Sequence, residues 1–283
     1  MDLLVHGGAG SDPAEPDPRL AALEDARRAG LAQDDPITAV RTAVRELESA
    51  PRFNAGVGGA VQDDGVVRTD AGLMTGDGTC GAAASLPGVA HPVDVAHTVA
   101  VETPHVLLAG DAAVAFAEAV EVATDRDLTT AETRDRFGDA DPPGEEAAFA
   151  DRLAWIRDHF GGTDTVGAVA TDGEEICAAT STAGRWFALA GRVGDVPQVG
   201  AGFYASERAA ASATGEGEAI ARFGLARQVV EAVEAGAPPG AAADGQLRAF
   251  DSRTGSRAGV IVVDANGRGG RASNAARMQT AGI

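Results

Sequence analysis

The sequence contains no lysine, so all 23 of its basic residues are arginine. Lysine Schiff-base chemistry and a phosphate-binding P-loop both require a lysine, and the chain can therefore have neither. Aromatic residues make up only 4% of the chain, whereas 37 residues are glycine. We therefore expect a core of Ala, Val and Leu in which backbone segments approach each other closely.

Cysteine and long apolar runs are also scarce. Cys80 and Cys177 are the only cysteines, too few for a disulfide framework and without the spacing of metal ligands. No apolar run reaches the ~20 residues needed to span a bilayer. Residues 1–6 lack the basic region of a signal peptide. We therefore expect a soluble, cytoplasmic protein.

Acidic residues outnumber basic ones by 42 to 23, which gives a net charge of −19. Such a surface repels nucleic acids and anionic membranes, so neither is expected as a partner. A strongly acidic surface is typical of proteins in a high-salt cytoplasm, where salt screens self-repulsion over a few ångström. We therefore expect a halophilic protein.

Hydrophobic periodicity predicts alternating helices and strands within one layered α/β domain over residues 1–283. The acidic stretch 121–146 shows little apolar periodicity and is predicted to be a surface loop. Helices are predicted over 19–29, 37–48, 93–101, 109–122, 152–160 and 217–234, strands over 2–5, 166–171, 174–179 and 259–264, and a hairpin over 59–69.

The most informative feature is the junction between Asp164 and Thr165. A polar, glycine-rich approach ends there, and an apolar strand of small residues begins at once. If the Asp164–Thr165 bond were cut, the Thr165 hydroxyl would be a nucleophile and its own α-amine the base. A threonine in a strand also needs no special explanation, because strands are rich in threonine.

The segment after Thr165 indicates which side chains face it. If Asp172-Gly173 forms a two-residue turn, Thr165 lies opposite Thr180, and Thr182 lies on the same side of the sheet. Spacing alone does not choose between the two hydroxyls.

Two later segments carry groups suited to a substrate. Arg192 and Asp195 lie three residues apart between glycines, and they fit the carboxylate and ammonium of a free amino acid, although a surface ion pair is the simpler interpretation. Thr214 precedes Gly215 and a predicted helix. Thr214 is either an N-cap or, with a neighbouring backbone N–H, part of an oxyanion site.

Several motifs follow one another in an order typical of one family. The chain resembles the plant-type (type III) L-asparaginase/isoaspartyl peptidase group of the N-terminal-nucleophile (Ntn) hydrolases over nearly its whole length. The motifs are His6-Gly7-Gly8-Ala9-Gly10, Phe53-Asn54-Ala55-Gly56, Thr69-Asp70-Ala71-Gly72, Asp164-Thr165-Val166-Gly167, Thr180-Ser181-Thr182, Gly191-Arg192-Val193-Gly194-Asp195 and Thr214-Gly215-Glu216-Gly217-Glu218.

The resemblance implies an α/β (α+β) four-layer αββα sandwich that cuts itself after Asp164 into an α-subunit, residues 1–164, and a β-subunit, residues 165–283. It further implies these roles: Thr165 as nucleophile, Thr182 as the supporting hydroxyl, Arg192 and Asp195 as ligands of the substrate carboxylate and amine, Thr214 and Gly215 as the oxyanion hole, Asn54 as the residue that orients the nucleophile region, and Gly217 close to the substrate.

The expected reaction is the hydrolysis of L-asparagine, of β-aspartyl dipeptides, or of both, without a cofactor for catalysis. The resemblance implies a homodimer of cut protomers. It also implies a structural sodium ion bound through the backbone oxygens of Leu47, Glu48, Ala50, Phe53, Ala55 and Val57.

Two residues depart from the family's pattern: Ala183 stands where glycine is usual, and Val196 where serine is usual. Both put the substrate preference in doubt. Glycosylasparaginase-like and threonine-protease-like hydrolases are alternatives, as is a non-catalytic descendant of the fold. An α/β-hydrolase lacks support because no Gly-x-Ser-x-Gly occurs, and the glycines 56, 58 and 59 are a weak match to a nucleotide-binding loop.

Overall fold

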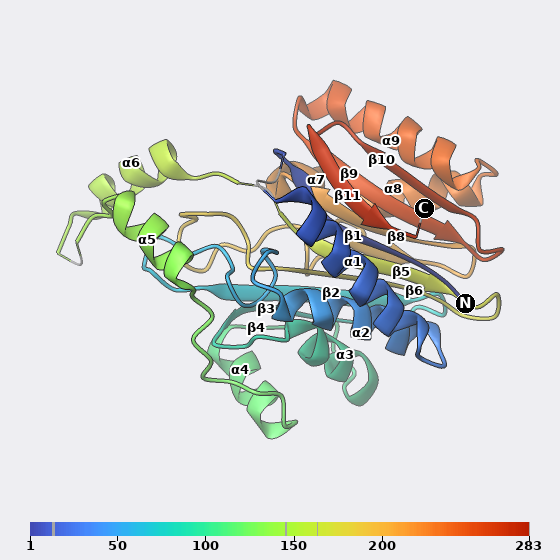
Figure 1. The fold of residues 1–283 in the computed structure, drawn as a ribbon, viewed down its shortest axis with the longest axis horizontal. Coiled ribbons are helices and arrows are strands. Elements are labelled where there is room, and N and C mark those ends of the chain that lie inside the picture. Colours follow the sequence, from blue (N-terminus) through green and yellow to red (C-terminus); the bar gives the residue numbers. More distant parts are fainter. Residues whose placement is uncertain (13–14, 145, 163, 283) are drawn as a thin grey trace.

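The computed structural model describes residues 1–12, 15–144, 146–162 and 164–282. Two sheets are stacked face to face, and helices cover the outer face of each (Figure 1). This four-layer arrangement confirms the expected α/β sandwich. Among the described residues, no helix is long and apolar enough to cross a membrane.

The first sheet has seven strands in the order β11-β1-β5-β6-β2-β3-β4. All neighbours are antiparallel except β3 and β4. Its strands are β1 (Asp2–Gly10), β2 (Arg68–Thr75), β3 (Cys80–Pro87), β4 (Leu107–Ala109), β5 (Val166–Thr171), β6 (Ile176–Thr182) and β11 (Arg277–Ala281).

The second sheet has the order β10-β9-β8-β7 and is antiparallel throughout. Its strands are β7 (Phe203–Ala205), β8 (Ala209–Gly215), β9 (Ala258–Asp264) and β10 (Gly269–Ser273). On its outer side lie α7 (Gly217–Phe223), α8 (Leu225–Glu234) and α9 (Pro239–Thr254).

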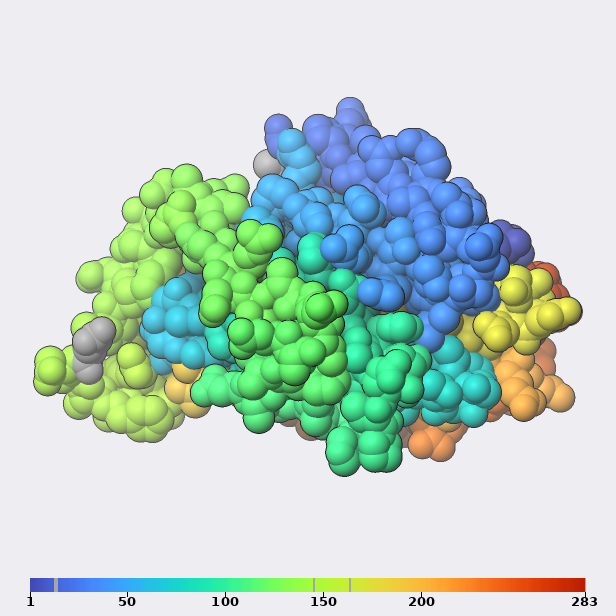
Figure 2. Space-filling view, turned by 90° about the horizontal axis from the view of Figure 1, so that it is seen from below, coloured from blue at the N-terminus to red at the C-terminus, as the bar shows by residue number. Residues whose placement is uncertain are grey.

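The helices of the first half of the chain cover the first sheet. In the space-filling view of Figure 2, α1 (Pro16–Leu31) and α2 (Pro36–Ser49) form the blue part of this face, beside α3 (Pro92–Glu102) and α4 (Gly110–Ala119) in green. Asp35 caps α2 by accepting the N–H of Thr38 at 2.8 Å, and Pro36 occupies the first turn, as the sequence predicts. The helices α5 (Ala131–Asp139) and α6 (Phe149–His159) lie at one end of the molecule.

Small residues let the layers pack closely. Between the two sheets, Leu4, Val169, Ala178, Phe203, Ala210 and Ile261 form one buried cluster. A second cluster lies between the first sheet and α1–α3, and a third joins the second sheet to α8 and α9. The prediction of an Ala/Val/Leu core is confirmed, and both faces of β5 and β6 are buried.

Strands that precede and follow the Asp164–Thr165 junction are interleaved in the first sheet. β5 and β6 follow the junction in sequence, yet they lie between β1 and β2, which precede it. The strand β11 pairs with the other edge of β1. The proposed fragments 1–164 and 165–283 therefore share one continuous hydrogen-bonded sheet.

Several predicted elements differ in the structure. The stretch 121–146 is not only a loop, because Thr130 and Thr133 cap α5 reciprocally. The helix predicted over 217–234 is broken at Gly224, whose φ of +71° ends α7 and precedes α8. The hairpin predicted over 59–69 is reduced to a bridge between Val61 and Val67, because the longer strand begins only at Arg68.

Candidate functional site

Thr165 lies immediately before β5, and its side chain is buried, with only 4% of the residue exposed. The loop between β5 and β6 is longer than predicted, since Thr171 pairs with Ile176 and four residues form the turn. This register puts Val166 opposite Ser181, so Thr165 comes to the level of Thr182 rather than Thr180. The prediction that Thr165 faces Thr180 is wrong for that reason, and the structure favours Thr182.

The peptide carbonyl of Asp164 is held by two donors. Asn54 donates from Nδ2 to this oxygen at 3.1 Å, and the hydroxyl of Thr182 lies 3.1 Å from it. Asn54 is itself fixed, because it also donates to the carbonyl of Gly184 at 2.6 Å and accepts the N–H of Ala60 at 2.7 Å. Two preorganised donors on one carbonyl form the arrangement that stabilises an oxyanion.

The glycine-rich segment of β1 lies against this junction. A Cβ on Gly8, whose φ is +107°, would lie 1.6 Å from the Asp164 carboxylate and 3.2 Å from the backbone nitrogen of Thr165. Any side chain there would clash, so the junction depends on a glycine at position 8. The N–H of Ala9 in the same strand donates to the Thr214 hydroxyl at 3.2 Å.

Thr214 lies inside β8 and Glu216 is the N-cap of α7, so the interpretation of Thr214 as an N-cap is wrong. Gly215 ends the strand with a φ of +140°, and a Cβ there would lie 2.4 Å from the carbonyl oxygen of Arg257. Strand β1 therefore links Thr214 to the junction: Ala9 donates to the Thr214 hydroxyl, and Gly8 lies against Asp164 and Thr165.

Arg192 and Asp195 converge at Gly217. A Cβ on Gly217 would lie 2.7 Å from Nη2 of Arg192 and 2.7 Å from Oδ1 of Asp195. Asp195 is buried, and burial raises the pKa of its carboxyl to about 6, against the opposing effect of Arg192. A cation and a carboxylate thus meet over a residue without a side chain, and together they match the two charges of a small zwitterion.

Glu218 forms an ion pair with Arg192. Its carboxylate accepts from Nε of Arg192 at 2.8 Å and lies 3.3 Å from Nη1 of Arg185. Burial alone would raise the pKa of Glu218, but the two arginines lower it below its ordinary value. Glu218 stands in the Thr214-Gly215-Glu216-Gly217-Glu218 motif, but the sequence does not predict its pairing with Arg192, which lies 26 residues away.

Two further charged residues were missed. Arg19 binds the side chain of Asp164 at 2.7 Å and also donates to the carbonyl of Gly7. Burial raises the pKa of Asp164 to about 6, although Arg19 opposes the shift. Asp70 is buried opposite Thr182, and burial raises its pKa to about 7. Asp70 stands in the Thr69-Asp70-Ala71-Gly72 motif, and an aspartate at the start of an apolar stretch is unusual enough to have suggested a role for it.

The two departures from the family's pattern are both buried. The methyl group of Ala183 packs with Val61, Val67 and Leu128, and it lies 2.4 Å from where a Cβ on Gly59 would stand. The side chain of Ala183 thus contributes to an apolar cluster. Val196 lies beside Gly202, whose Cβ would be 2.7 Å from the Val196 Cα.

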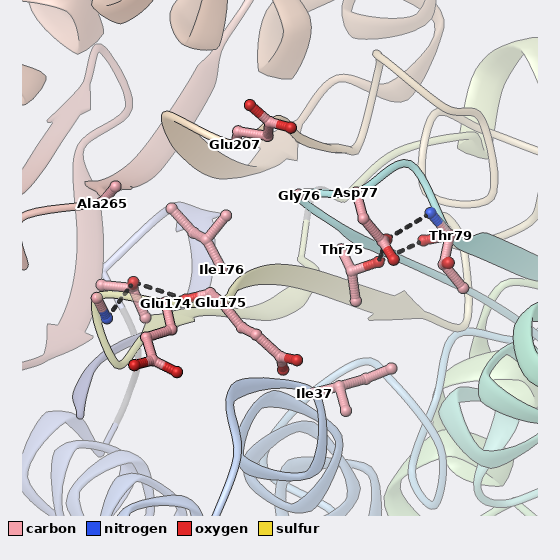
Figure 3. A pocket seen from close by; sticks show the side chains of 12 residues that line it. Ile37, Thr75, Gly76, Asp77, Thr79, Glu174, Glu175, Ile176, Glu207 and Ala265 are labelled. Atoms are coloured by element: carbon pink, nitrogen blue, oxygen red, sulfur yellow. Dashed lines mark hydrogen bonds between the residues drawn. The ribbon is translucent and has the colours of Figure 1, made fainter.

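A separate cavity of about 540 Å³ lies at the opposite end of β5 and β6 (Figure 3). Six residues of strand, about 20 Å, separate it from Thr165. Its carboxylates come from Asp77, Glu174, Glu175 and Glu207, and none of the predicted site residues lines it. The predicted residues therefore gather at the other end of the strands.

The family model that matches this chain and two of its curated relatives are all named as asparaginases. The model of the family described as asparaginase matches residues 1–283. A plant-type L-asparaginase of Pyrococcus abyssi is 38% identical over 99% of this chain and 95% of its own length. An isoaspartyl peptidase/L-asparaginase of Xenopus laevis is 35% identical over 94% of this chain and 86% of its own length.

Proposed function

Because the chain belongs to the asparaginase family, we propose that it hydrolyses L-asparagine to aspartate and ammonia and cleaves β-aspartyl peptides, after cutting its own Asp164–Thr165 bond. One observation carries the proposal: the carbonyl before Thr165 is held by Asn54 and Thr182.

Self-cleavage begins with attack of the Thr165 hydroxyl on the carbonyl carbon of Asp164. Negative charge develops on the carbonyl oxygen, where Asn54 and Thr182 donate. The C–N bond then breaks as the nitrogen gains a proton, which leaves an ester on the Thr165 oxygen. Cleavage of that bond frees the α-amine of Thr165, and water then hydrolyses the ester, so Asp164 acquires a carboxylate and Thr165 regains its hydroxyl.

The cut chain then acts on its substrate. Arg192 binds the α-carboxylate of the substrate, and Asp195 binds its α-ammonium next to Gly217. The α-amine of Thr165 takes the hydroxyl proton during attack on the side-chain amide and returns it to the leaving ammonia or amine. The Thr214 hydroxyl and the Gly215 N–H stabilise the oxyanion, and water releases aspartate.

Glu218 must release Arg192 when the substrate binds. Both of its oxygens face arginine side chains in the uncut chain, and it is only half-buried. Exchange of one carboxylate for another on Arg192 keeps the local charge balanced.

The test uses the purified full chain. Intact mass and a denaturing gel should show fragments 1–164 and 165–283, and the cut protein should release ammonia from L-asparagine and leucine from β-aspartyl-leucine. A chain that stays whole on prolonged incubation and releases neither product would refute the proposal.

The residue 47–57 loop supports a sodium site. Val57 donates to the carbonyl of Glu48 and Phe53 to that of Ala50, both at 3.0 Å, so the loop curls on itself. Each carbonyl keeps a second lone pair, and an all-oxygen set suits a hard cation. The backbone oxygens of Leu47, Glu48, Ala50, Phe53, Ala55 and Val57 would hold this ion, whose role is structural.

We also propose a homodimer of cut protomers in the cytoplasm of a halophilic organism. The net charge of −19 supports the high-salt setting, since screening reduces self-repulsion. Light scattering at low and high salt should give twice the protomer mass; a monomer in both would contradict the dimer.

A further inference from the structure

Arg185 lies at the edge of the site and binds the segment that self-cleavage sets free. Its side chain is 16% exposed, and its Nε donates to the carbonyl of Gly162 at 2.8 Å. Its guanidinium lies 4.1 Å above the ring of Phe160. Arg185 thus contacts two residues that end up in the terminal stretch of the first fragment.

The segment before the junction covers the site in the uncut chain. Gly161 and Trp186 exchange two backbone hydrogen bonds, at 3.0 and 3.2 Å, and Phe160 lies near Arg192 as well as Arg185. Thr165 and Asp195 are each only 4% exposed in this state. Substrate therefore gains access when this segment moves away, which also frees the guanidinium of Arg185 from Gly162 and Phe160.

Arg185 and Arg192 are held close together, because both contact the carboxylate of Glu218 at 3.3 and 2.7 Å. Next to Arg185 lies a cavity of about 580 Å³, which is also lined by Ser11, Arg257 and Asn274. Two arginines, Arg185 and Arg257, line this cavity against one carboxylate, that of Glu216, so its wall is locally cationic in a chain of net charge −19 and suits an anion.

We propose that Arg185 of the cut enzyme binds the carboxylate of the leaving amino acid of a β-aspartyl peptide. The inference rests on the proposed function and names its preferred substrate class. Arg192 takes the α-carboxylate of the aspartyl residue, and Arg185 takes the carboxylate of the residue that departs. Asparagine has no second carboxylate, so Arg185 favours peptides over asparagine.

The test compares three substrates on cut protein: β-aspartyl-leucine, its C-terminal amide, and L-asparagine. Rates are divided by the fraction of cut chain on a denaturing gel, since Arg185 also contacts the uncut segment. The wild-type enzyme should prefer the free acid over the amide by at least about tenfold in kcat/KM, the range of a charge-assisted hydrogen bond. Arg185→Gln should reduce this preference to within about twofold, and Arg185→Lys should restore part of it.

Arg248→Gln is the matched control, because it makes the same charge change at an exposed position of α9. It should leave the acid-to-amide ratio unchanged. Equal use of acid and amide by the wild-type enzyme would overturn the proposal, as would an equal fall on all three substrates in Arg185→Gln. If wild-type protein is cut but hydrolyses none of the three, the proposed function is wrong and the subsite with it.

Discussion

The two ends of β5 carry the same residue types in opposite surroundings. Asp164 and Thr165 precede the strand, while Thr171 ends it and Asp172 follows. Asp172 is exposed and accepts the N–H groups of Glu174 and Glu175, and these backbone bonds lower its pKa. Asp164 is enclosed beside Arg19, and burial raises its pKa to about 6.

The difference shows that the size of a cavity does not indicate where the candidate catalytic residues of this molecule lie. The cavity of about 540 Å³ lies at the Thr171 end, where Glu207 lines it and the Asp77 carboxylate accepts from Thr75 and Thr79 (Figure 3). At the Thr165 end, Thr165 is only 4% exposed, and the Asp164 carbonyl is already held by Asn54 and Thr182. This burial suits the proposed self-cleavage, because the bond to be cut already lies inside the chain.

The sharpest test of this contrast replaces each of the two threonines, Thr165 and Thr171, with alanine in a separate variant. Thr165→Ala removes the proposed nucleophile, so we expect a chain that stays whole and releases no ammonia from asparagine. Thr171→Ala removes a buried hydroxyl that donates to Glu175 at 2.7 Å, so it should cost about 1 kcal/mol of stability and still be cut normally. Intact mass distinguishes the two outcomes, and cleavage of Thr165→Ala at the same bond would refute the assignment.

Asn54→Ala should produce the next largest effect. It removes one of the two donors to the Asp164 carbonyl, and loss of such a donor typically slows a reaction by about 10²–10³-fold. The measurement is the rate of fragment appearance on denaturing gels. Asn266→Ala, at the exposed turn after β9, serves as the control and should mature at the wild-type rate. Unchanged maturation of Asn54→Ala would show that this bond only shapes the loop.

Arg192→Lys should weaken substrate binding by about 10–100-fold in kcat/KM, because lysine cannot bind a carboxylate in two places. The loss should be largely in KM if Arg192 binds the substrate carboxylate equally in the ground and transition states. Arg227→Lys, which changes an exposed pair with Glu231, is the matched control. Equal kinetics of the two variants would exclude Arg192 as the carboxylate ligand.

The smallest effect concerns pH. The pKa of Asp164 is higher in the folded chain than its ordinary 3.8, so the uncut protein binds more protons than the unfolded one. Its free energy of unfolding should therefore fall as pH rises from about 4 to about 6. In a Thr165→Ala background, Asp164→Asn should reduce the total change in unfolding free energy over this pH range by on the order of 1–2 kcal/mol. The effect is modest because the Asp164 side chain keeps 27% exposure and solvent screens its charge.

Urea unfolding at several pH values measures the slope, and the constant cost of leaving Arg19 unpaired does not affect it. Asp172→Asn should act in the opposite direction. The lowered pKa of Asp172 means that its stabilisation is present at neutral pH and is lost as pH falls below about 4. Parallel slopes in the two variants would contradict the electrostatic contrast between the ends of β5.

Much of the fold was predictable because it depends on local patterns. Asp35 and Pro36 mark the start of α2, and the alternation of β5 and β6 with polar turns marks a hairpin. The register was not predictable, since Asp172-Gly173 resembles a two-residue turn while the Asp172 side chain accepts two N–H groups and widens it to four residues.

The site was predictable where a motif carried it and not where folding assembled it. Asn54, Thr182 and Arg192 all stand in quoted motifs, and the structure brings Asn54 and Thr182 to one carbonyl. Arg19 had no such signal, because its partner Asp164 lies 145 residues away and the ion pair exists only in the folded chain. Side-chain pairs between distant segments depend on packing that one sequence does not display.

The interleaving of strands in the first sheet has a consequence for the kinetic stability of the cut protein. Before the cut, folding is an event within one chain and does not depend on concentration. If the proposed cut is made, β5 and β6 belong to a different polypeptide from β1 and β2, so refolding requires two molecules to meet. We therefore expect a cut enzyme whose lifetime is set by its rate of unfolding. Once such a protein unfolds and its two fragments separate, their low concentration is enough to prevent refolding.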